Sequence, residues 1–142
     1  MKLFAILAGL AAMFFTVTSN AQGVSIDPGL WEMTTTMTMT MMPQPQTTTI
    51  KECIEESELS PESFDMDEDN PCTISAVTID DNSARWSINC PTEGGPAMEG
   101  EWEFTSKGDS ISGSGTMTAD FAGQKMGFDM TWEGKRIGDC KE

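Results

Sequence analysis

The sequence predicts an all-β protein, an antiparallel meander of about seven strands that forms a barrel or half-barrel, with one short helical turn and two disulfides. Apolar and polar residues alternate with a period of two along much of the chain, which is the period of a half-buried strand. The alternating segments are regularly spaced, and short turn sequences join them, as in antiparallel hairpins. No segment is long enough for the helix that a parallel crossover requires.

Residues 1–21 have the pattern of a secretory signal peptide. Lys2 supplies a positive charge, Leu3–Val17 is an apolar run, and small residues end the segment at Ala21. The run is shorter than the roughly 20 residues of a spanning helix, so we expect no stable membrane insertion after cleavage. We therefore expect a periplasmic or secreted protein with a single β-domain over residues 22–142.

The first strand begins at Trp31 and alternates up to Met41. The residues that share one face of it are Trp31, Met33, Thr35, Met37, Met39 and Met41, while glutamate and threonine occupy the other face. Threonine is β-branched and favours strands, so this pattern predicts one wet and one buried face. We expect the prolines of Met42–Gln46 to break the ladder and a second strand to resume at Thr47–Cys53.

An acidic segment follows, with nine acidic residues and no basic one between Glu52 and Asp69. Ser60 is a suitable N-cap and Pro61 suits the first helical position, so we expect a short helical turn there. Asp65–Asn70 alternates like the start of a calcium loop, but it lacks the glycine and the distal glutamate that such a loop needs. We expect a solvated acidic loop.

Three hairpins complete the meander. In the first, around the turn at residues 80–83, the expected partners are Cys72 with Cys90, Ile74 with Ile88, and Ala76 with Trp86. In the second, around Lys107 and Gly108, they are Met98 with Met117, Trp102 with Gly113, and Phe104 with Ile111. In the third they are Met117 with Met126, Gly115 with Phe128, and Gly113 with Met130. Aromatic residues thus face glycines, and Trp132 ends the series.

The four cysteines of an exported chain indicate two disulfides. The hairpin register favours Cys72–Cys90, which leaves Cys53–Cys140. The alternative, Cys53–Cys72 with Cys90–Cys140, stays open because spacing alone does not decide connectivity. The spacing also lacks the Cys-x-x-Cys pattern of a zinc site.

Charge and composition argue against several functions. Residues 22–142 contain 7 basic residues (8 minus Lys2) and 23 acidic ones, a net charge of 7 − 23 = −16. Such a surface repels phosphate backbones and anionic lipid, so we expect no nucleic-acid partner and no role at an anionic membrane surface. The chain has no histidine and no tyrosine, and the usual nucleophile pairs cannot be built. We expect no enzyme activity and no cofactor.

The chain resembles an exported family of Gram-negative bacteria, the domain-of-unknown-function 3617 family. The resemblance rests on the segments "GLWEMTTTMTM", "KEC", "ARWSINC" and "GKRIGDC" in that order, and it covers nearly all of residues 22–142. It implies a small periplasmic protein of unknown activity. It implies no catalytic or ligand-binding residues.

The methionines allow two hypotheses. A face of methionine and aromatic side chains is typical of an adaptable core or an apolar pocket, which would hold an apolar small molecule or support a periplasmic partner protein. The residues expected to line it are Trp31, Met33, Met37, Met39, Phe128, Met130 and Trp132. In the alternative, the thioethers of Met37, Met39 and Met41 bind Cu(I) or Ag(I), since soft ligands suit these ions.

Overall fold

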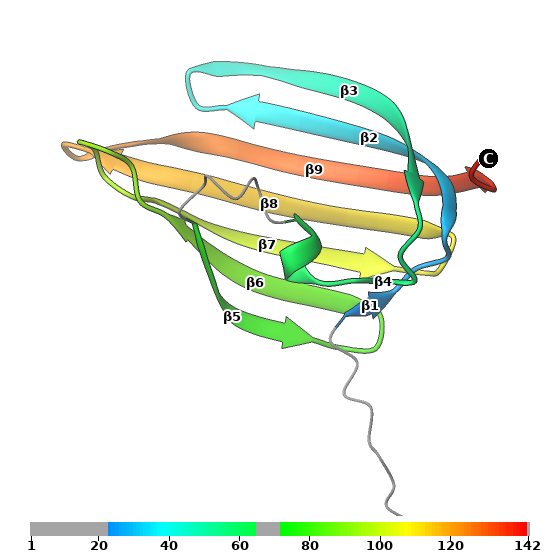
Figure 1. Cartoon of the computed structure of the whole chain (residues 1–142). Helices are drawn as coiled ribbons and strands as arrows, with labels where there is room; N and C mark the ends of the chain where they lie inside the picture. Colours follow the sequence, from blue (N-terminus) through cyan, green and yellow to red (C-terminus); the bar gives the residue numbers. More distant parts are fainter. Residues whose placement is uncertain (1–22, 65–71, 142) are drawn as a thin grey trace, which may run out of the picture.

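In the computed structural model, which describes residues 23–64 and 72–141, seven antiparallel strands form one curved sheet (Figure 1). These strands are β2 (Gly29–Met39), β3 (Met42–Ile54), β5 (Thr73–Ile79), β6 (Ser83–Cys90), β7 (Met98–Ser106), β8 (Ser110–Phe121) and β9 (Gln124–Gly138). Their order in the sheet is β3-β2-β9-β8-β7-β6-β5. Because β3 and β5 are edges that do not meet, the sheet is a half-barrel, and the predicted fold class is confirmed.

Two very short strands and a helical turn lie across the lower part of the sheet in Figure 1. Strand β1 (Val24–Ser25) pairs with β4 (Glu58–Leu59), and the 3₁₀ turn η1 (Pro61–Phe64) follows. The helical turn was predicted from Ser60 and Pro61. Its start is closed by two hydrogen bonds, in which the Ser63 N–H donates to the Ser60 carbonyl and the Ser60 N–H donates to the Ser63 hydroxyl.

Strand β3 begins at Met42, so the second strand starts earlier than the predicted Thr47. The expected break is present in the ladder itself, because the pairing of β2 with β3 shifts register between Met37 and Met39, opposite residues 43–45. Proline cannot donate a ladder hydrogen bond, but β3 is an edge strand and one side of its backbone has no partner strand. The preceding strand also ends earlier than predicted, at Met39, and Met41 lies in the two-residue turn between β2 and β3.

The predicted registers of the last two hairpins are wrong by two residues. Strand β7 sets Trp102 opposite Gly115, and β8 sets Gly113 opposite Trp132. The turns are Gly108–Asp109 and Ala122–Gly123, one residue further along the chain than predicted. Positive φ angles at Gly108, Ala122 and Gly123 allow these tight turns.

The first of the three hairpins is correct at its open end and wrong near its turn. Ile74 pairs with Ile88 as expected, but a register shift after Ser75 removes the predicted pairing of Ala76 with Trp86. Ala76 has a φ of 50°, a conformation typical of an irregular position in a strand.

Both disulfides are present, as Cys72–Cys90 and Cys53–Cys140. The predicted signal peptide and the Asp65–Asn70 segment lie outside the described residues. Within the described part of the chain, no helix has the length and hydrophobicity that a membrane span requires.

Candidate functional site

The sheet has one apolar and one polar face. On the apolar face the buried side chains of the described strands are Trp31, Ala84, Trp86, Ile88, Trp102, Phe104, Ile111, Met117, Ala119 and Trp132. The alternate positions of the same strands carry hydroxyls and carboxylates, among them Thr34, Glu103 and Ser112, which face water. The two-residue period therefore separates the faces as predicted.

Three tryptophans form a row across the middle of the apolar face. The rings of Trp86 and Trp102 are stacked with centroids 6.5 Å apart, and those of Trp102 and Trp132 are 5.5 Å apart. The rings of Trp102 and Trp132 can lie this close to the sheet because β8 has glycines beneath them. A Cβ at Gly113 would lie 2.2 Å from the Trp132 ring, and one at Gly115 would lie 2.5 Å from the Trp102 ring.

One half of the apolar face is covered by two segments, one that contains β1 and one that contains β4 and η1. Val24 and Ile26 of the first and Leu59 of the second are buried, with 0 %, 3 % and 8 % of their surface exposed. The cover is fixed by polar contacts as well, since the buried Ser106 hydroxyl donates a 2.7 Å hydrogen bond to the Ser25 carbonyl. Among the described residues, this half is a closed core.

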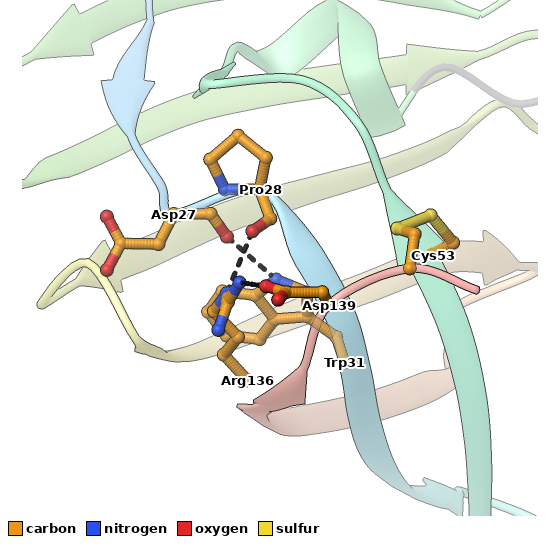
Figure 2. A network of polar contacts seen from close by, with 7 residues as sticks. Asp27, Pro28, Trp31, Cys53, Arg136 and Asp139 are labelled. Atoms are coloured by element: carbon orange, nitrogen blue, oxygen red, sulfur yellow. Dashed lines mark hydrogen bonds and ion pairs between the residues drawn. A yellow bond between two sulfur atoms is a disulfide. The ribbon is translucent and has the colours of Figure 1, made fainter. Parts of the chain in front are cut away.

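A polar network holds the cover to the C-terminal part of the chain (Figure 2). The Trp31 indole N–H donates a 3.0 Å hydrogen bond to the Asp27 carbonyl, and the Arg136 Nε donates a 2.8 Å bond to the Pro28 carbonyl. Arg136 also pairs with Asp139. These contacts fix the chain where it enters β2, so they serve the fold.

The other half of the apolar face, here called the open half, lies at the end of the sheet that carries the β2–β3 turn. Its side chains are Met37, Met39, Met98, Met126, Phe128 and Met130. Met39 is 38 % exposed, and the other five are half-buried. Met37 pairs with Met130 and Met39 with Phe128, so neighbouring strands bring these residues together. Partly exposed thioethers beside an aromatic ring form an adaptable apolar surface, and the open half is the candidate site.

Comparison with known proteins decides the family. The model of the family described as "Protein of unknown function (DUF3617)" matches residues 26–140. The chain belongs to the DUF3617 family. No curated protein and no solved structure matches it. Because the family description assigns no activity to DUF3617 proteins, the candidate site depends on the geometry of this chain.

The seven residues predicted to line a pocket divide between the two halves. Met37, Met39, Phe128 and Met130 lie in the open half. The other three predicted residues are core: Trp31 is 0 % exposed, Trp132 is 6 % exposed, and Met33 packs beside Gly134. All seven residues lie on the apolar face, and their role in binding a ligand stays a prediction.

The prediction left out Met98 and Met126, which complete the open half, and Met117, which is buried beneath it. A sequence signal for them existed, since all three lie on the same alternation as the aromatic residues. The register error placed Met126 opposite Met117 where the structure has Phe128, but a shift of two residues leaves these side chains on the same face.

Among the described residues, the soft-metal donors that lie together are thioethers, since the cysteines are in disulfides. Met39 faces Met42 across the β2–β3 turn, and Met41 lies in the turn itself, 75 % exposed. Met37 is further along β2 and opposite Met130. Within the described residues, no group of three or more histidine, cysteine, aspartate or glutamate side chains is arranged to hold a metal ion. The Cu(I) hypothesis stays a prediction.

The polar face carries shallow depressions over β8, where small side chains lie between longer ones. One of about 400 Å³ is lined by Glu32, Lys107, Ser110, Ser112, Glu133 and Lys135, among others. Hydroxyls, carboxylates and ammonium groups surround it, so it does not suit an apolar ligand.

Proposed function

We propose that this protein is an exported, non-catalytic binding protein of the periplasm and that the open half holds an apolar small molecule. One observation carries the proposal. The same apolar face is sealed at one end and partly exposed at the other, where Met39 is 38 % exposed beside half-buried Phe128 and Met130. Apolar surface left partly exposed in this way is typical of a binding site.

The chemistry of the open half favours a ligand of variable shape. Methionine is unbranched and polarisable, so a cluster of methionines adapts to different apolar molecules at small cost in packing. The row of tryptophans beside the open half forms a rigid back wall, because Trp102 and Trp132 each lie over a β8 glycine and Trp86 is stacked on Trp102. A flexible lining on a rigid wall suits lipid-like or aromatic compounds.

Export is supported by the signal-peptide pattern of residues 1–21 and by the two disulfides, which persist in oxidising compartments. N-terminal sequencing of protein from the periplasmic fraction tests this part of the proposal. The expected first residue is Gln22, and a chain that still begins at Met1 in the cytoplasm would contradict it.

Binding can be tested with N-phenyl-1-naphthylamine, a neutral dye that fluoresces in apolar surroundings, followed by competition with fatty acids and aromatic compounds. We expect energy transfer from the tryptophans to the bound dye, because the row of rings adjoins the open half. In the variant Met130→Glu, a charge in the lining should weaken dye binding by roughly tenfold or more.

The matched control is Val77→Glu, which places the same charge on β5, where Val77 is 43 % exposed and far from the open half in the sheet order. It should bind the dye like the wild type. The proposal fails if no lipid-like or aromatic compound changes the tryptophan emission, or if both variants lose binding equally.

A further inference from the structure

The β2–β3 hairpin is free of charge over a long stretch. From Met33 to Ile50 there is no aspartate, glutamate, lysine or arginine, although the chain as a whole carries 31 such residues (8 basic plus 23 acidic). Strand β2 alone needs only one polar face for solubility, and threonine supplies it. The absence of charge at the end of the hairpin therefore calls for a separate explanation.

The end of this hairpin exposes apolar side chains. Met39, Met41 and Met42, here called the methionine tip, are 38 %, 75 % and 50 % exposed. The tip lies at one end of the sheet, at the turn between β2 and β3 (Figure 1). The open half of the apolar face is continuous with it, because Met39 pairs with Phe128.

Part of the backbone at the tip is hydrogen-bonded within the protein, which lowers the cost of placing it in an apolar environment. The Thr40 N–H donates a 2.9 Å hydrogen bond to the Gly127 carbonyl, and the Thr40 hydroxyl donates to the same carbonyl at 3.0 Å. The Gly127 N–H in turn donates to the Thr40 hydroxyl at 3.1 Å. Unpaired backbone groups are the main obstacle to placing a turn in hydrocarbon, and here part of that demand is already met inside the protein.

We propose that the methionine tip docks this protein on a zwitterionic lipid surface by inserting its three thioether side chains below the headgroups. The shape of the tip and the charge of the protein favour a lipid surface over a partner protein or a second copy of this chain. A two-residue turn is a narrow protrusion, and three side chains cannot supply the about 800 Å² per partner of a stable protein interface. Two copies would also repel each other, since each chain has a net charge of −15.

The same net charge favours lipids with neutral headgroups over anionic ones. An anionic bilayer repels a protein of charge −15, so binding should be strongest on neutral vesicles and should weaken as anionic lipid is added. Salt should partly restore binding to mixed vesicles, because it screens the repulsion. A tip that bound through basic residues would show the reverse dependence.

Flotation with phosphatidylcholine vesicles, and with equimolar phosphatidylcholine and phosphatidylglycerol, tests the proposal. The double variant Met41→Gln/Met42→Gln should lower the partition coefficient on phosphatidylcholine by roughly tenfold. Its unfolding midpoint in urea should match that of the wild type, because both side chains are at least half exposed. The control Ile50→Gln removes an apolar side chain of the same hairpin that is 53 % exposed but distant from the turn, and it should bind vesicles normally.

Three results would overturn the proposal. The first is a wild-type protein that does not float with phosphatidylcholine, and the second is an equal loss in the tip variant and the Ile50→Gln control. The third is a wild-type protein that sediments as a dimer and becomes monomeric in the tip variant, which would make the tip an interface between copies. Dye binding in the open half is measured separately, so it can persist when vesicle binding fails.

Discussion

The glycines under the tryptophan row provide the sharpest test of the packing. In Gly115→Ala, the new Cβ would lie 2.5 Å from the Cδ2 and Cε3 atoms of Trp102. Ordinary carbon–carbon contact needs about 3.5–4.0 Å, so the ring must move by about 1 Å. It has little room, because Trp132 lies 5.5 Å away on one side and Trp86 lies 6.5 Å away on the other, centroid to centroid. Overpacking of this kind costs about 1–3 kcal/mol of unfolding free energy.

A double-mutant cycle with Trp102→Phe separates this clash from a general effect on the strand. The smaller ring leaves space for the new methyl group, so the double variant should be more stable than the sum of the single changes by about 1 kcal/mol or more. Urea denaturation followed by far-ultraviolet circular dichroism, with both disulfides intact, gives the four free energies. Thr116→Ala on the polar face of the same strand is the control and should change stability by less than about 0.5 kcal/mol. If the two single changes in unfolding free energy add to that of the double variant within about 0.5 kcal/mol, the proposed clash between the Trp102 ring and a side chain at position 115 is refuted.

Three further predictions concern the cross-links, a turn and the thioethers. Chain-entropy theory gives a stabilisation of about 4.6 kcal/mol for Cys53–Cys140, with a separation of 87 residues, and about 3.2 kcal/mol for Cys72–Cys90, with a separation of 18. The variant Cys53→Ala/Cys140→Ala should therefore unfold at a lower urea concentration than Cys72→Ala/Cys90→Ala. The reverse order would contradict an effect of loop length. Ala122→Gly should stabilise the protein by about 0.5–1 kcal/mol, because Ala122 has a φ of 56° that glycine adopts without strain; a destabilised variant in thermal unfolding would contradict this. If the Cu(I) hypothesis holds, titration under reducing conditions should give an affinity above that of free methionine, and Met39→Leu/Met41→Leu should abolish the excess; unchanged affinity in that variant removes the hypothesis.

The faces of the strands could be predicted from the sequence even where the register could not. A shift of two residues leaves every side chain on its own face, so the errors in the β7–β8 and β8–β9 hairpins did not change which residues are apolar and inward. The register itself depends on turn chemistry. Ala122 at positive φ is unusual for a tight hairpin turn, so the sequence pointed to the wrong pair of central residues.

The division of the apolar face into a covered and an open half could not be predicted. The cover comes from β1 and β4, which have two residues each and no periodicity to detect. Their place is fixed by contacts between residues far apart in the chain, such as the hydrogen bond from the Ser106 hydroxyl to the Ser25 carbonyl. Local pattern carries no information about such contacts, and for this reason Trp31 was expected to line a pocket when it is fully buried.

The residue types of the two halves differ in a way that packing alone does not require. Trp31 and Phe104 are fully buried in the closed part, whereas five of the six side chains of the open half are methionines. Leucine or isoleucine would bury as much apolar area in a permanent core and would pack with more defined rotamers. Methionine has the advantage where the opposite surface changes, because its side chain adjusts to whatever it meets. The concentration of methionine at the partly exposed end of the face, and from there into the methionine tip, therefore supports the proposal that this surface binds apolar molecules of varying shape.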